Sequence, residues 1–183
     1  YNFPSVIETN ELSNLRLKVR NFIAKSINDG GFSQTADAWV FSASPDFSKK
    51  IGTMGWLGMS FPKKYGGHER TALERYIVTE ELLASGAPVA AHWIADRQSG
   101  SQILRFGTEE QKNLIIPKIT SGECFFAIGM SEPDSGSDLA SVKTKATKTK
   151  TMTALVAPAF QTKSKRDLFS HNDEIIEFNT DQD

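Results

Sequence analysis

The segment Ser131–Asp138, which reads Ser-Glu-Pro-Asp-Ser-Gly-Ser-Asp, contains the residues best suited to binding a ligand. Hydroxyl groups at Ser131, Ser135 and Ser137 can donate hydrogen bonds, and a Gly- and Ser-rich loop exposes several main-chain N–H groups together. A concave set of such donors binds anions or electron-rich ring edges. The same composition is typical of an ordinary turn held by Asx and Ser side chains. Composition alone leaves both interpretations open.

Other titratable and nucleophilic residues predict no catalytic centre. The sequence has no Walker loop, no GxGxxG after a strand, no HExxH and no GxSxG. His68, His92 and His171 lie far apart without metal-ligand spacing, so we expect surface or capping histidines. Cys124, the only cysteine, lies in an apolar run, which favours an inert buried thiol. The following carboxylates are expected to be solvated or capping groups: Glu80, Glu81 and Asp96.

Composition indicates an ordinary globular protein. The 183 residues are 39% hydrophobic and 23% charged, values that favour a folded core over disorder. A net charge of −1 leaves no basic excess, so no nucleic-acid partner is expected. The longest apolar runs, such as Leu114–Ile116, are too short to span a bilayer. A single cysteine excludes an internal disulfide and favours a reducing compartment.

Helical patterns dominate the sequence up to about residue 120. One amphipathic stripe ends at Gly30 and consists of Leu12, Leu15, Val19, Phe22, Ile23 and Ile27. A short helix is expected around 47–54, and capping boxes at Thr71–Glu74 and Thr108–Gln111 begin two more. Another helix is predicted over 90–106.

These patterns also predict which side chains face the core. The expected inner faces are Phe47, Ile51 and Met54; Leu73, Tyr76, Ile77 and Leu83; and Leu114, Ile115 and Ile119. The segment Gly30–Pro45 is expected to be a loop with Trp39, Val40 and Phe41 packed down. Gly55–Gly67 is expected to be an irregular connector with buried aromatic residues, because its glycines and Pro62 interrupt a helix.

A β region is predicted to follow. Cys124–Met130 is apolar and suits a buried strand, and Val142–Thr153 alternates Lys and Thr as an exposed or edge strand does. The predicted fold class is α+β, mainly α: an amino-terminal helical bundle followed by the first strands of an incomplete β domain. The expected domains are 1–122, 123–153, and a divergent, poorly ordered tail over 154–183.

Residues 129–138, Gly-Met-Ser-Glu-Pro-Asp-Ser-Gly-Ser-Asp, resemble the signature of the acyl-CoA dehydrogenase family. The resemblance covers roughly residues 10–148. It also includes Trp56-Leu57-Gly58 through Gly67, Glu80-Glu81-Leu82, the run Phe106–Lys112, and then Pro117, Gly122 and Glu123.

The resemblance implies an FAD flavoprotein that acts on an acyl-CoA thioester. Its cofactor-binding residues would be Ile128, Met130, Ser131, Gly136 and Ser137. Ser137 would also approach the CoA portion of the substrate, and helical residues around Ala87–Gln98 would resemble the wall of the acyl pocket. The implied partner is an electron-transfer flavoprotein, the full-length family implies a homo-oligomer, and the implied location is the cytoplasm or the mitochondrial matrix.

The resemblance ends after about Thr149. The family's reaction is α,β-dehydrogenation of the thioester, and it uses a Trp-x-Thr/Ser segment and a glutamate base from a carboxy-terminal helical domain. Neither has a counterpart here, since Trp39, Trp56 and Trp93 all precede the loop. We therefore expect a fragment or truncated form with no identifiable catalytic residue, inactive alone. The alternatives are a non-enzymatic helical interaction module, or a fragment of an acyl-CoA oxidase or flavin-dependent monooxygenase.

Overall fold

The computed structural model describes residues 8–128, 131–132, 134–141, 143, 145–148 and 153–156. The chain forms two compact units, one up to Ile128 and one beyond it, and each is described by itself. The first unit is helical and the second contains the strands, so the predicted α+β class with mainly α structure is confirmed. Most of the predicted tail, residues 157–183, lies outside the described residues.

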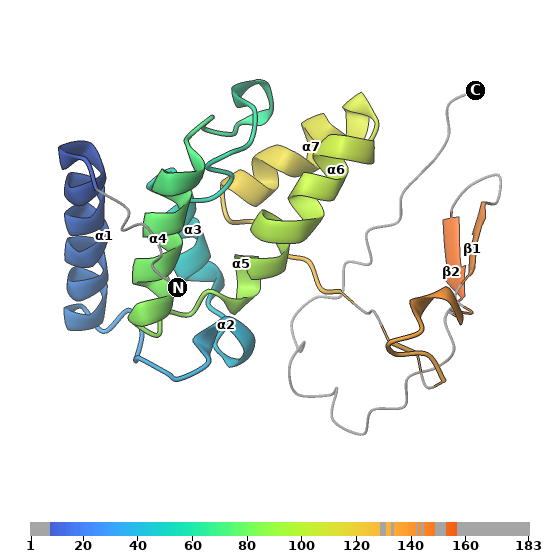
Figure 1. The fold of residues 1–183 in the computed structure, drawn as a ribbon, viewed down its shortest axis with the longest axis horizontal. Helices are drawn as coiled ribbons and strands as arrows, with labels where there is room; N and C mark the ends of the chain where they lie inside the picture. Colours follow the sequence, from blue (N-terminus) through green and yellow to red (C-terminus); the bar gives the residue numbers. More distant parts are fainter. Residues whose placement is uncertain are drawn as a thin grey trace, which may run out of the picture. The chain divides into compact units, whose positions relative to one another are not determined.

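The described residues of the helical unit form seven α-helices, which carry the labels of Figure 1. They are α1 (Asn10–Asn28), α2 (Ala38–Phe41), α3 (Pro45–Thr53), α4 (Ala72–Ala84), α5 (Ala90–Ile94), α6 (Gly100–Phe106) and α7 (Glu109–Thr120). A 3-10 turn occupies Lys63–Tyr65. A π-helical turn, Ala95–Ser99, joins α5 to α6, so the helix predicted over 90–106 is interrupted by a wider turn.

Local sequence signals fix where α1, α4 and α7 begin. Thr9 caps α1 by accepting a hydrogen bond from Leu12 N–H. Both predicted capping boxes are present, at Thr71 with Glu74 and at Thr108 with Gln111. Each box satisfies main-chain N–H groups that would otherwise lack a partner in the first helical turn.

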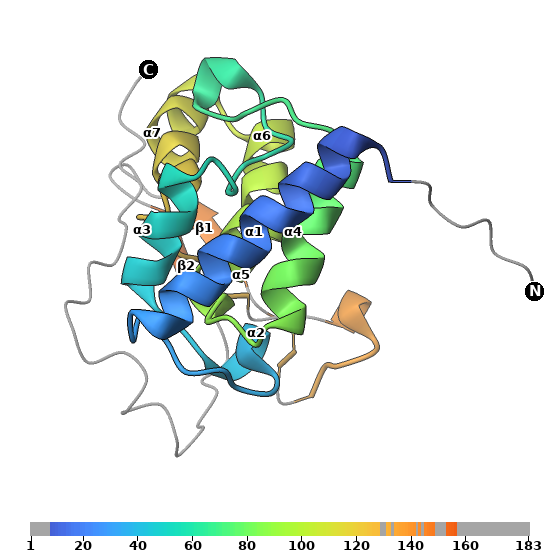
Figure 2. The ribbon, with the colours of Figure 1, turned by 90° about the vertical axis from the view of Figure 1, so that its left-hand side faces the viewer.

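Two hydrophobic clusters form the core of the helical unit. Helix α1 packs against α4, and Figure 2 shows it lying over that helix. The first cluster joins α1, α3 and α4 through Val19, Ile23, Phe47, Ile51, Trp56, Leu57, Met59, Val78, Leu82, Ala87 and Val89. The second lies around α7 and contains Phe61, Tyr65, Ala95, Ile115, Ile116 and Ile119.

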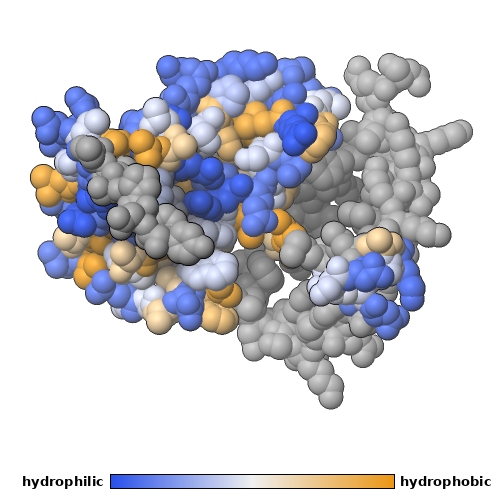
Figure 3. Space-filling view, in the orientation of Figure 1, coloured by the Kyte–Doolittle hydropathy of each residue, from blue (hydrophilic) through white to orange (hydrophobic). Residues whose placement is uncertain are grey.

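Several predicted inner faces are wrong. Leu73, Tyr76 and Leu83 on α4 and Leu114 on α7 are exposed. Each helix carries more apolar residues than one face can hold, and neighbouring elements select the buried set, which on α4 includes Val78 and Leu82. On the face seen in Figure 3, hydrophobic residues form several separate patches among hydrophilic ones.

The prediction that Trp39, Val40 and Phe41 pack down is also wrong. These residues form α2, and their exposed fractions are 48%, 47% and 76%. A four-residue helix has too few positions to bury three consecutive large side chains on one face.

The connector over 55–67 is irregular and buries Trp56, Phe61 and Tyr65, as predicted. Gly58 in this connector has a φ of +60°, and a Cβ atom there would collide with the Thr120 side chain. Glycine therefore allows the connector to lie close to α7.

The predicted buried strand Cys124–Met130 is wrong for its described part. Residues 124–128 form no strand, and residues 129 and 130 lie outside the described residues. Cys124 and Phe126 pack on the second cluster while Phe125 and Ile128 are exposed. The segment alternates as a strand does, but no strand pairs with it within the described residues.

The second unit contains an antiparallel pair of strands. β1 (Lys145–Lys148) pairs with β2 (Thr153–Val156), with Lys145 opposite Val156 and Lys148 opposite Thr153. Within the described part of the strand predicted over 142–153, β1 covers residues 145–148, and β2 begins only at the last predicted residue. None of the described helices is long and apolar enough to cross a membrane.

Candidate functional site

The loop Ser131–Asp138 is closed by its own hydrogen bonds. Glu132 N–H donates to the Ser135 carbonyl at 2.8 Å, and Ser135 N–H donates to the Glu132 carbonyl at 3.1 Å. The Ser135 hydroxyl donates to the Asp138 carbonyl at 2.8 Å, and Ser135 is only 3% exposed. Ser135 therefore holds the turn and is not free to donate to a ligand, contrary to the prediction for its hydroxyl.

Lys143 stabilises this loop from outside. Its main-chain N–H donates to the Glu132 carboxylate at 2.8 Å, and its Nζ lies 3.3 Å from Asp134 Oδ2. Lys143 thus contacts two carboxylates of the loop, Glu132 through its main-chain N–H and Asp134 through its charged ammonium. The Asp134 pair is exposed, so it contributes little to stability, and its main effect is to position the turn.

The predicted cofactor-binding residues have different surroundings. Ser131, Gly136 and Ser137 are exposed on the loop. A Cβ atom built at Gly136 would meet nothing within 4 Å, so packing does not explain the glycine. Ile128 is 45% exposed and belongs to the helical unit. Met130 lies outside the described residues. The structure thus brings together three of the five predicted residues.

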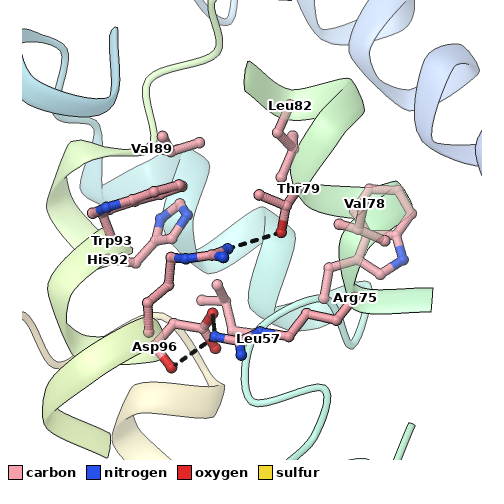
Figure 4. Close-up of a pocket in the computed structure, with 11 residues that line it drawn as sticks. Leu57, Arg75, Val78, Thr79, Leu82, Val89, His92, Trp93 and Asp96 are labelled. Atoms are coloured by element: carbon pink, nitrogen blue, oxygen red, sulfur yellow. Dashed lines mark hydrogen bonds and ion pairs between the residues drawn. The ribbon is translucent and has the colours of Figure 1, made fainter. Parts of the chain in front are cut away.

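The helical unit contains a separate small cavity that the sequence did not predict. It lies between α4, α5, the π-helical turn and the connector residues Trp56 and Leu57. Its volume of about 20 Å³ is room for about one water molecule. In Figure 4, Val78, Thr79 and Leu82 project from α4 toward His92 and Trp93 on α5.

The cavity has a buried floor and a half-buried polar rim. The buried lining residues are Trp56, Leu57, Val78, Leu82, Val89, His92 and Asp96. Arg75, Thr79, Trp93 and Arg97 are half-buried and form the rim. Five of the lining residues fall within the segment 87–98, which the family resemblance associated with an acyl pocket.

Asp96 is a buried carboxylate, so the expectation of a solvated or capping side chain is wrong. It accepts a hydrogen bond from Gly58 N–H at 2.6 Å and lies 3.3 Å from Arg75 Nη2. Arg75 also donates to the Asp96 carbonyl at 3.3 Å, while its buried Nε has no hydrogen-bond partner within the described structure. Asp96 therefore ties the connector to the π-helical turn and to α4.

Arg97 lies across the rim of the cavity. Its guanidinium carbon is 4.5 Å from the centre of the Trp93 ring, and its Nη1 donates to Thr79 Oγ1 at 3.0 Å. Burial lowers the pKa of Arg97, and the positive charge of Arg75 lowers it further. The guanidinium remains charged, because its ordinary pKa is far above neutrality.

His92 belongs to the core and is not the surface or capping histidine that the sequence predicts. It is 4% exposed, and its Nδ1 lies 2.8 Å from the Ser48 hydroxyl. Burial lowers the pKa of His92 to about 4, so the imidazole is neutral near pH 7. His68 is half-buried, and burial lowers its pKa as well. His171 lies outside the described residues.

The spacing of the four rim residues is a sequence signal that could have indicated this cavity. Trp93 and Arg97 are four residues apart, as are Arg75 and Thr79, so each pair can share one helix face. What the spacing does not indicate is that the two pairs face each other.

The described part of the chain has neither a reactive cysteine nor a metal site. Burial raises the pKa of the half-buried Cys124 thiol, which agrees with an inert cysteine. The described residues contain no cluster of His, Cys, Asp and Glu side chains that could hold a metal ion.

Comparison with known proteins relates most of the chain to one family. The family model described as acyl-CoA dehydrogenase, N-terminal domain, matches residues 9–123. FadE26, an acyl-CoA dehydrogenase of Mycobacterium tuberculosis, is 40% identical over 97 residues, which cover 53% of this chain and 24% of FadE26. Mitochondrial isovaleryl-CoA dehydrogenase of Pongo abelii is 36% identical over 143 residues, covering 76% of this chain and 34% of that protein.

Solved structures show the same relationship. The Tcur3481-Tcur3483 steroid ACAD is similar with a TM-score of 0.69 and 30% sequence identity, over 83% of this chain and 39% of that chain. The chain spans only about a quarter to a third of the length of the two curated relatives, at 24% and 34%.

Proposed function

Since this chain belongs to the acyl-CoA dehydrogenase family, we propose that it supplies the amino-terminal helical part and the flavin loop of an FAD-dependent oxidoreductase. The substrate would be an acyl-CoA thioester, and the reaction α,β-dehydrogenation. The observation that carries the proposal is the family match over 9–123, followed directly by the Ser131–Asp138 loop.

The geometry of the loop is compatible with a bound flavin. Ser131, Gly136 and Ser137 are exposed, and the space beside Gly136 is open. The inward bonds of Ser135 keep the loop closed without using the Ser131 and Ser137 hydroxyls. A ligand therefore finds donors on a turn that is already held in shape, which lowers the ordering cost of binding.

Within the proposed site, Ser131 and Ser137 would hold FAD by donating hydrogen bonds, and Gly136 would allow close approach of the main chain. Ser137 would also approach the CoA portion of the substrate. Ile128 and Met130 are proposed to line the ring. FAD supplies hydride acceptance, and the role of this chain's residues is to bind and orient it.

The remaining family properties are proposals for the assembled protein. The segment 87–98 would form a wall of the acyl pocket, and an electron-transfer flavoprotein would accept the electrons. A homo-oligomer and a location in the cytoplasm or mitochondrial matrix fit the same family, in which the Pongo abelii relative is mitochondrial.

We also propose that the 183-residue chain does not catalyse the reaction by itself. Orientation of reacting groups contributes a large share of enzymatic rate enhancement. No residue of this sequence matches the family's glutamate base or its Trp-x-Thr/Ser segment. We infer that the proposed site lacks the groups that would remove the α-proton.

An FAD titration of the purified chain tests the flavin role. We expect quenching of flavin fluorescence by the wild-type chain and affinity at least about tenfold weaker in Gly136→Val. A side chain at 136 meets open space in the protein, so this variant should fold normally and obstruct only the ligand. Ala140→Val, at an exposed position on the neighbouring turn, is the control.

Equal affinity in wild type and Gly136→Val, or no binding by wild type, would contradict the flavin role. Anaerobic addition of an acyl-CoA should leave the flavin oxidised. Bleaching of the flavin by the acyl-CoA would contradict the proposed inactivity.

The alternative, a non-enzymatic interaction module, has one observation in its favour. Trp39, Val40 and Phe41 on α2 expose large apolar side chains in succession. A colourless protein that forms a stable oligomer, and loses it in Phe41→Ser, would favour this second function.

A further inference from the structure

The cavity between α4 and the π-helical turn contains more positive charge than its own carboxylate can neutralise. Arg75 and Arg97 both line it, and Asp96 is the only acidic residue among the described lining residues. His92 adds no charge near pH 7, since burial holds its pKa at about 4. The lining therefore has one unbalanced positive charge.

The direct contacts of the Asp96 carboxylate are with Gly58 and Arg75, and it attracts Arg97 only through its charge. Its carboxylate accepts from Gly58 N–H at 2.6 Å and contacts Arg75 at 3.3 Å. Arg97 meets a neutral hydroxyl at Thr79 and the face of Trp93, and in the described part of the chain no carboxylate pairs with it. A guanidinium has five N–H donors, so most of those on Arg97 remain available.

Arg75, which also lines the cavity, has an unused donor of its own. Its Nε is buried and has no hydrogen-bond partner within the described residues. A buried donor without a partner is unfavourable, and such groups in native proteins usually meet a water or a ligand. The arginines come from α4 and from the π-helical turn, a kind of helix irregularity that is frequent at functional sites.

We propose that this cavity binds a carboxylate group, held by Arg97 with Arg75 beside it. A single negative charge matches the unbalanced charge of the lining, and the planar guanidinium matches a carboxylate in two parallel hydrogen bonds. Val78, Leu82 and Trp93 give apolar walls for the carbon chain that carries the carboxylate.

The size of the cavity sets how the carboxylate enters. The space of about 20 Å³ holds about one water-sized group, so Arg97 must leave Thr79 to admit a carboxylate. The carboxylate could belong to a small free acid or to the far end of an acyl group on a thioester. The second source rests on the proposed acyl-CoA function, and the first does not.

NMR spectroscopy can follow the indole N–H resonance of Trp93, which is identified by its loss in the Trp93→Phe variant. The chemical shift of this resonance reports on Arg97 because the two side chains stack. In the full chain without flavin, we expect sodium acetate to shift this resonance saturably at constant ionic strength kept with sodium chloride. Arg97→Gln should weaken acetate binding at least about tenfold, and Arg97→Lys should weaken it less. Thr79→Val should strengthen it, because Arg97 loses its competing acceptor.

Arg105→Gln is the matched control, since Arg105 lies 5.0 Å over the exposed Phe106 ring and away from the cavity lining. Its affinity for acetate should equal that of wild type. Circular dichroism shows whether each variant is folded. If Arg97→Gln unfolds, the acetate affinity of Arg97→Lys is compared with that of wild type instead.

Adipoyl-CoA and hexanoyl-CoA distinguish the two sources. A Trp93 shift with adipoyl-CoA but not hexanoyl-CoA assigns the carboxylate to an acyl end, and a shift with acetate alone assigns it to a free acid. No shift with acetate or adipoyl-CoA, equal shifts in Arg97→Gln, or equal shifts with hexanoyl-CoA would overturn the proposal. The FAD titration with Gly136→Val is independent, so failure of the flavin role is recognised separately.

Discussion

At the residue scale, His92 and Ser48 form a buried polar pair in the middle of the helical unit. Ser48 is fully buried, and its hydroxyl donates to the Ser44 carbonyl at 3.0 Å. Because a hydroxyl has one hydrogen, the Nδ1–H of His92 then donates to Ser48 at 2.8 Å. Protonation at Nε2 would leave this hydrogen bond in place, but burial makes the charged imidazolium unfavourable, and the charge of Asp96 offsets that cost only in part.

This pair makes stability depend on pH. The folded pKa of His92 is about 4, and an unfolded histidine titrates near its model value of 6.5. Between these values the unfolded chain binds more protons, so stability is complete above pH 6.5 and falls as the pH is lowered toward 4. The loss should reach about 3 kcal/mol, measured by urea denaturation across this range.

His92→Gln should flatten that pH dependence, because glutamine does not titrate. His68→Gln is the control: His68 is only half-buried, so most of the dependence should persist in that variant. An unchanged slope in His92→Gln would show that another group titrates in this window.

At the element scale, α1 and α4 are joined by ion pairs as well as by apolar packing. Arg20 makes two hydrogen bonds to the Glu81 carboxylate, at 2.8 and 3.0 Å, and Arg16 also pairs with Glu81. Arg16 contacts Glu80 at 2.5 Å as well. Glu81 is 8% exposed, so the expectation of a solvated or capping carboxylate is wrong for this residue.

Glu81 should therefore matter more than its neighbour. Glu81→Gln leaves two guanidiniums without their central carboxylate, and we expect a loss of about 2 kcal/mol in unfolding free energy. Glu80 is the matched comparison, because its side chain is 39% exposed and Glu80→Gln should cost under about 1 kcal/mol. Chemical denaturation at neutral pH measures both, and equal losses would contradict a special role for Glu81.

Acid should weaken the same contact. Hydrogen bonds from Arg20 lower the pKa of Glu81 below its ordinary value. A carboxylate with a lowered folded pKa stabilises the protein above its unfolded pKa, near 4.5, and loses that contribution as pH falls further. This window begins near the acid end of the His92 window, and the His92→Gln variant separates the two effects.

At the scale of the whole molecule, the two hydrophobic clusters lie entirely within the unit that ends at Ile128. The cluster members and the partly buried residues packed against them run from Leu15 to Phe126, and Cys124 and Phe126 pack on the cluster around α7. The loop Ser131–Asp138 and the strands belong to the second unit.

A shortened chain, residues 8–128, should consequently fold by itself. We expect the same cooperative thermal transition by circular dichroism as in the whole chain, and loss of FAD binding with the loop. A lower midpoint or a gradual transition would show that residues beyond Ile128 contribute to the helical core.

Local signals explain what could be predicted about the fold. Thr71 with Glu74 and Thr108 with Gln111 place the beginnings of α4 and α7, because a capping box acts within four residues. The choice of buried face could not be predicted as well. Helix α4 offers both Leu73 and Val78 to a core, and the elements packed around α4 decide that Val78 is buried.

The sequence by itself determined the beginnings of α4 and α7, the mainly α class, and the loop Ser131–Asp138 that resembles the acyl-CoA dehydrogenase signature. These depend on contacts between near neighbours or on a contiguous motif. Only the tertiary structure decided that Asp96 meets Gly58, 38 residues away, and that Arg75 on α4 faces Arg97 on the π-helical turn. Such pairs form because packing joins distant segments, and no local pattern specifies which segments meet.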